Sequence, residues 1–207
     1  HAMAHDETGP VVPNCFTCVH PALPGGDYPF ADLCGAGVAY KLAWEIARRW
    51  CGSERVPQVF RDQLLDLLAL AALGTVADVV PLRDENRAIV RHGLGRIKHT
   101  RYAGLNALID VSRLRDEKID AFHVGFVLGP RLNACGRLGH ARDACELLTE
   151  ATGKRARELA NHLNHVNDER RATERGIVDE AKQMIEATDD LDQRRAFVLA
   201  SDQWHPG

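Results

Sequence analysis

The feature that most constrains the fold is one long helical pattern, which runs from Lys154 to about Ala187. Its stripe recurs at the spacing of a helix and consists of Leu159, Leu163, Val166, Thr173, Ile177, Ala181 and Met184. At about 1.5 Å per residue, such a helix spans roughly 50 Å, which is more than one compact core needs. We therefore expect residues 151–190 to form a connector helix between two domains.

The connector divides the chain into unequal parts. Residues 9–150 precede it and are long enough to bury a core of their own. After it, Ala196 to Ala200 has the pattern of a buried strand, so residues 191–207 are expected to be the truncated start of a second domain. Residues 1–8 are expected to be left over from expression or to be the remnant of an upstream motif, which makes the chain a fragment.

The region before the connector is mostly helical by its patterning. Val38, Leu42, Ile46 and Trp50 form one apolar stripe, and Gly52 is a stop signal. Further helices are expected from Asp62, from Asp84 to about His99, from Tyr102 to Ile109, from Asp120 to Leu128 and from Ala141 to Leu148. The predicted fold class is α/β and strongly helix-rich.

Breaks are expected where glycine, proline and β-branched residues gather. The segment from Thr75 to Pro81 favours a brief strand or an extended turn. Gly129-Pro130 predicts a break, and Gly136 to Gly139 predicts a turn. Residues 131–137 are therefore expected to lie on a loop flanked by glycines.

The charge balance limits the kinds of partner. The formal net charge is −3, so binding of nucleic acid by bulk attraction is excluded and any such contact must be local. Residues 83–101 carry a local charge of +4. This charge either attracts a strand of nucleic acid or belongs to the solvated face of a helix. Six scattered cysteines and the absence of an apolar leader or a membrane-length run favour a cytoplasmic protein without membrane contact.

Three separated stretches resemble the RecJ family of single-strand-specific exonucleases, within the DHH phosphoesterase superfamily. They are residues 33–42 (LCGAGVAYKL), residues 72–82 (ALGTVADVVPL) with Glu85-Asn86-Arg87, and residues 129–138 (GPRLNACGRL). Residues 163–170 (LNHVNDER) and 204–207 (WHPG) are weaker echoes. These matches follow the order of the family through nearly the whole chain.

The resemblance implies both a fold and an activity. Residues 9–150 would be the C-terminal part of a DHH catalytic domain, and residues 191–207 would begin a second domain of the DHHA1 type. The activity would be metal-dependent 5′-to-3′ digestion of single-stranded DNA in repair and recombination. Its cofactor would be Mn²⁺ or Mg²⁺, and its partners would be single-stranded DNA and repair proteins.

Asp78 is the candidate catalytic and metal-binding residue. It lies between Ala77 and Val79, in an apolar stretch where an unpartnered carboxylate is costly to bury. A hard divalent cation would explain it, as would an aspartate that bonds to the backbone of a turn. The resemblance favours the metal, because Asp78 falls on the last aspartate of the family's cluster. His5 and Asp6 are candidates for a degenerate relic of the Asp-His-His signature.

Arg131, Asn133 and Arg137 are candidate ligands of a phosphate. On a glycine-flanked loop, guanidinium groups and backbone N–H groups would approach a phosphate closely. The alternative is structural, with Arg131 paired to an internal carboxylate and Asn133 capping the turn.

Two other groups have the residue types of a metal site. Cys15 and Cys18 form a lone CxxC pair, to which His20 adds a third candidate ligand, but small packed thiols in a loop are the stronger interpretation. His162 and His165 lie one turn apart on the long helix, where exposed surface histidines are common.

Two other functions remain open from the residues alone. One is a different DHH phosphoesterase that acts on short oligonucleotides or cyclic dinucleotides. The other is a catalytically inactive scaffold in repair or replication.

Because one reliable carboxylate cannot hold two ions, we expect little or no nuclease activity from the fragment by itself.

Overall fold

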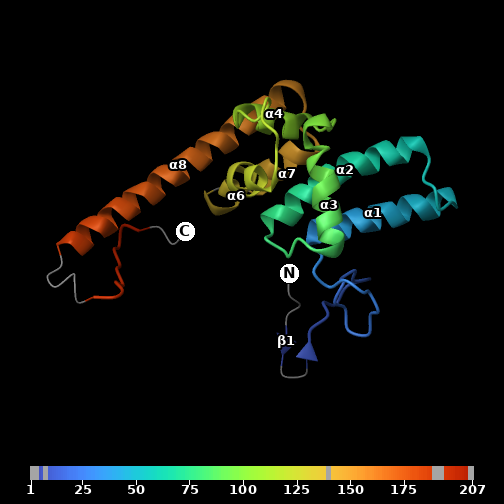
Figure 1. The fold of residues 1–207 in the computed structure, drawn as a ribbon, viewed down its shortest axis with the longest axis horizontal. Coiled ribbons are helices and arrows are strands. Elements are labelled where there is room, and N and C mark those ends of the chain that lie inside the picture. The colour runs from blue at the N-terminus through green and yellow to red at the C-terminus, as the bar shows by residue number, and fades with distance from the viewer. Residues whose placement is uncertain (1–4, 7–8, 139–140, 188–193, 205–207) are drawn as a thin grey trace.

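The computed structural model describes residues 5–6, 9–138, 141–187 and 194–204. It consists of a helical body from which one long helix extends (Figure 1). The helices are α1 (Gly35–Cys51), α2 (Gln58–Ala77), α3 (Asp84–Leu94), η1 (Ile97–His99), α4 (Ala103–Val111), α5 (Ala121–His123), the π-helix η2 (Val124–Leu128), α6 (Gly129–Leu138), α7 (Ala141–Thr149) and α8 (Gly153–Glu186). Two short antiparallel strands, β1 (His5–Asp6) and β2 (Gly9–Pro10), precede them.

The helix-rich part of the predicted fold class is confirmed, whereas its strands are not. Thr75 to Ala77 is the last turn of α2 and not a brief strand. The hydroxyl of the β-branched Thr75 donates to the carbonyl of Ala71 at 2.7 Å, which is how a buried threonine is accommodated in a helix. Residues 194–204 contain no strand, and Val198 is fully exposed, because no neighbouring strand of the described chain pairs with it.

Small residues bring α1, α2 and α3 close together. A Cβ atom on Gly74 of α2 would lie 2.5 Å from the Cβ of Ala36, and one on Gly93 of α3 would lie 2.4 Å from the Cβ of Ala72. Only the start of the predicted stripe of α1 packs inward, at Val38, whereas Ile46 and Trp50 face outward and are 56% and 82% exposed. The sequence pattern therefore located the helix correctly but not the side that packs. Its predicted end is confirmed, since Gly52 caps α1 in the left-handed region.

The main core lies where α4, η2, α7 and the first half of α8 meet. Its fully buried side chains include Leu105, Leu108, Leu128, Leu147 and Leu163. The extent predicted for the long helix is confirmed by α8, which has 34 residues and a length of roughly 50 Å. Figure 1 shows its second half extending beyond the body.

The expected break at Gly129-Pro130 is wrong, because α5, η2 and α6 follow one another as a continuous helical column. The N–H of Gly129 donates to the carbonyl of Val124, five residues earlier, so the chain passes through one wide π turn. Pro130 then lies in the first turn of α6, directly after the π turn. Gly136 belongs to α6 rather than to a turn, whereas Gly139 lies outside the described residues.

Among the helices of the described ranges, none has the length and apolar character required to cross a membrane.

Candidate functional site

Asp78 lies at the C-terminal end of α2, where its N–H donates to the carbonyl of Gly74 at 2.9 Å. Its side chain is exposed, so the predicted burial cost of this carboxylate does not arise. The two residues before it are only partly buried, because α2 ends at the surface of the body. Asp78 therefore lies at the surface of the body, at the point where α2 ends.

The loop that follows Asp78 has an unusual backbone. Val79 and Asp84 have φ angles of 57° and 44°, although neither is glycine. A left-handed conformation costs an ordinary residue about 1–2 kcal/mol, and Val79 recovers little of it by packing because it is 87% exposed. Other contacts must therefore hold residues 78–84 in place.

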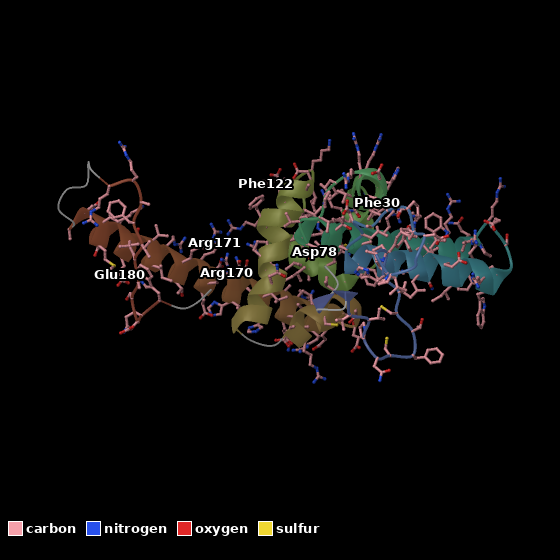
Figure 2. All side chains as sticks on the ribbon, turned by 90° about the horizontal axis from the view of Figure 1, so that it is seen from below. Phe30, Asp78, Phe122, Arg170, Arg171 and Glu180 are labelled. Atoms are coloured by element: carbon pink, nitrogen blue, oxygen red, sulfur yellow. The ribbon has the colours of Figure 1, made fainter. Side chains whose placement is uncertain are left out.

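The end of α2 meets the start of α6. A Cβ atom on Gly129 would lie 3.7 Å from the Cβ of Ala77, and one on Gly125 would lie 3.8 Å from Val76. Asp78, one residue further along, lies beside the column of α5, η2 and α6 in Figure 2. The structure thus brings Asp78 near the segment that carries the other candidates.

Arg131 is partly buried between α6 and α8. Its Nε donates to Oδ1 of Asn164 at 2.9 Å, and its Nη1 donates to the carbonyl of Val127 at 2.7 Å. Burial lowers the pKa of Arg131, an effect that Asp168 opposes and Arg171 adds to. The structural alternative is thus correct in part: Arg131 has an internal partner, which is an amide and not a carboxylate.

Arg131 and Asn133 do not lie on the loop that the sequence predicted, because residues 129–138 form α6. Because residues 129–138 are helical, Arg131 and Asn133 point about 160° apart around the axis of α6. Arg131 points to α8, whereas Asn133 is exposed. The side chain of Arg137 lies outside the described residues.

The described residues do not complete a metal centre. They contain no group of three or more histidine, cysteine, aspartate or glutamate side chains that is able to hold an ion. The backbone of His5 and Asp6 pairs with Gly9 and Pro10, but their side chains lie outside the described part. Asp78 brings one exposed carboxylate, and no catalytic step through a metal follows from the described residues alone.

The remaining metal candidates have other partners. The thiol of Cys15 donates to the carbonyl of Thr17 at 3.2 Å, in an exposed loop. His162 lies 3.6 Å from Asp143, and His165 lies 3.3 Å from Glu169, with both imidazoles largely exposed. These contacts agree with surface histidines rather than with a metal site.

Part of the basic segment at residues 83–101 is engaged within the chain. Arg83 pairs with Asp32 at 2.6 Å, and Arg101 pairs with the buried Asp66 at 2.5 Å. Arg87 and Arg91 are exposed on α3. The local charge of +4 therefore overstates the positive charge that this segment presents to a strand of nucleic acid.

Sequence reasoning missed a polar junction between α1, α3 and the segment before α1. The hydroxyl of Tyr28 donates to Glu85 at 2.6 Å, and the ammonium of Lys41 donates to the same carboxylate at 2.7 Å. Asn86, the next residue, is fully buried. Residues 85–87 carried part of the family resemblance, which was the signal available for finding them.

Comparisons with known proteins test the resemblance to the RecJ family. No family model matches the chain. RecJ of Bacillus subtilis is 42% identical over 203 residues, which cover 98% of this chain and 24% of that protein. RecJ of Escherichia coli is 35% identical over 211 residues, covering 98% and 36%. Both are named single-stranded-DNA-specific exonucleases, and the chain spans no more than about a third of their length.

Solved structures give the same result in three dimensions. The RecJ–Mn²⁺ complex of Thermus thermophilus is 34% identical with a TM-score of 0.65, over 83% of this chain and 24% of that one. An exonuclease RecJ bound to manganese is 32% identical with a TM-score of 0.70, over 90% and 44%. The resemblance to the RecJ family is thus confirmed along nearly the whole of this chain, which matches one segment of those longer proteins.

Proposed function

We propose that the protein to which this chain belongs is a metal-dependent exonuclease that digests single-stranded DNA from the 5′ end in repair and recombination. The observation that carries the proposal is the position of Asp78. Its carboxylate is exposed at the end of α2, beside the first turn of α6, within a segment that matches RecJ. The RecJ structures that match were solved with Mn²⁺ or Mg²⁺, and we propose the same cofactors here.

The side chains then divide into two roles. We assign Asp78 to the ligand set of a divalent ion, because carboxylate oxygens suit these hard cations. Arg131 supports the binding of a phosphate, since its two internal bonds use Nε and Nη1 and leave Nη2 without a partner among the described residues. Asn133 and Arg137, further along α6, would contact the strand at a different position.

The proposed domain organisation follows the same logic. Residues 9–150 form the C-terminal part of a DHH domain, residues 151–190 the connector and residues 191–207 the start of a DHHA1-type domain. The projecting half of α8 supports this division, because none of its side chains from residue 168 to 186 is buried. A single strand would pass between the two domains.

The absence of a disulfide among the described cysteines supports a cytoplasmic location.

The test is the replacement Asp78→Asn in the full-length protein, with digestion of a 5′-labelled single strand as the measurement. Asparagine keeps the shape of aspartate but removes the charge, so we expect the rate to fall by roughly 100-fold or more. Asp84→Asn is the matched control, since Asp84 is an exposed aspartate at the other end of the same loop. A wild-type rate for Asp78→Asn would remove the basis of the proposal.

A further inference from the structure

Asn86 connects two segments that are distant in sequence. It lies in the first turn of α3 and is 0% exposed. Its side-chain amide donates to the carbonyl of Asp32 at 2.8 Å and to the carbonyl of Pro81 at 3.0 Å. One buried side chain thus joins the segment before α1 to the loop that follows Asp78.

Arg83 adds a second, exposed link between the segment before α1 and the loop that follows Asp78. Its Nε and Nη2 donate to Oδ2 of Asp32 at 3.1 and 2.6 Å. Its own N–H donates to the carbonyl of Pro81 at 3.0 Å. The Arg83 side chain is 68% exposed, so solvent weakens this ion pair and the buried amide is the stronger restraint.

The loop needs such a restraint. Val79 and Asp84 both have left-handed backbone conformations, and Pro81 lies between them. Val79, Pro81 and Leu82 are exposed and provide little packing to hold the loop. The two bonds of Asn86 therefore act at the middle of a segment that has few other contacts.

We propose that Asn86 is the positioning residue of Asp78. By fixing the carbonyl of Pro81 against Asp32, its amide holds the loop in the conformation that presents the carboxylate beside α6. This inference rests on the proposed function, to which it adds a residue that does not touch the substrate. It also predicts an effect on the loop that is measurable without any activity.

The test uses Asn86→Ala, with Asn86→Ser as a milder variant that keeps a hydroxyl donor. Asn106→Ala is the matched control, because the amide of Asn106 also donates to two carbonyls, those of Thr100 and Tyr102. Hydrogen exchange of this chain reports on the loop through two bonded amides at its ends. They are the N–H of Asp78, bonded to Gly74, and the N–H of Arg87, bonded to Arg83.

We expect Asn86→Ala to speed exchange of both amides about tenfold or more, with a smaller effect for Asn86→Ser and none for Asn106→Ala. In the full-length protein, kcat should fall about 10–100-fold with the KM for the strand little changed, as for residues that orient a reacting group. A similar fall in kcat for Asn106→Ala would overturn the positioning role, because it would show a general effect of lost stability.

Unchanged exchange and unchanged kcat in Asn86→Ala and Asn86→Ser would also overturn the inference. The two proposals fail in different ways. If Asp78→Asn keeps the wild-type rate, the proposed function is wrong. If Asp78→Asn is inactive and the Asn86 variants behave like wild type, only the inference is wrong.

Discussion

The segment from Asp78 to Asn86 and the second half of α8 are opposites. The first is irregular, with two left-handed residues, yet a fully buried asparagine and an ion pair tie it to the segment before α1. The second is a regular helix in which no side chain from residue 168 onward is buried. Regular structure and firm attachment are therefore separate properties in this molecule, and the candidate catalytic carboxylate lies in the firmly attached part.

The largest expected effect on stability is the difference between substitutions in the two halves of α8. Leu163 is 0% exposed in the core, so Leu163→Ala should lower the free energy of unfolding by about 2–5 kcal/mol. Ile177 is only partly buried in the projecting half, and Ile177→Ala should cost about 1 kcal/mol or less. Urea unfolding followed by circular dichroism measures both. Equal losses would show that the second half is supported as firmly as the first.

A smaller effect is expected at Val79. Glycine adopts a φ of 57° without steric cost, and the Val79 side chain is 87% exposed, so Val79→Gly should raise the free energy of unfolding by about 1 kcal/mol. Val80→Gly is the control and should be destabilising, because Val80 does not have a positive φ. If both variants lose stability equally, the loop is not strained at Val79.

The smallest effect concerns Gly176 in the projecting half of α8. A Cβ atom there meets nothing within 4 Å, so Gly176→Ala should stabilise the helix by about 0.5–1 kcal/mol. Gly153, at the start of α8, has a φ of 51°, and Gly153→Ala should be destabilising instead. Thermal unfolding measures both variants: the unfolding temperature should rise for Gly176→Ala and fall for Gly153→Ala. A loss of stability in Gly176→Ala would mean that this part of α8 is packed against something.

Patterns that depend on neighbours along the chain could be predicted from the sequence. The extent of α8 follows from its apolar spacing, and the end of α1 follows from Gly52. Thr75 misled the prediction, because its hydroxyl bonds within the helix and also contacts Cys34, the N-cap of α1, which is distant in sequence. Pro130 misled it because a proline in the first turn of a helix resembles a break.

The candidate site was predictable only in part. Asp78 was identified through the family resemblance, whereas its exposure depends on where α2 ends. The expected glycine-flanked loop at residues 131–137 was wrong, because these residues belong to α6, and a helix turns the side chains of Arg131 and Asn133 to different sides. Asn86 was not identified as a candidate, because its importance lies in a bond to Asp32, 54 residues earlier.

Hydrogen exchange of the unmodified chain tests most directly whether the carboxylate is carried by the firmly attached region. The relevant amides are those of the last turn of α2 and of α3 from Arg87 onward, compared with those of residues 172–184 in α8. We predict that the first set exchanges at least about tenfold more slowly, because local openings are easiest where few apolar contacts are buried. Equal or slower exchange in residues 172–184 would contradict this account.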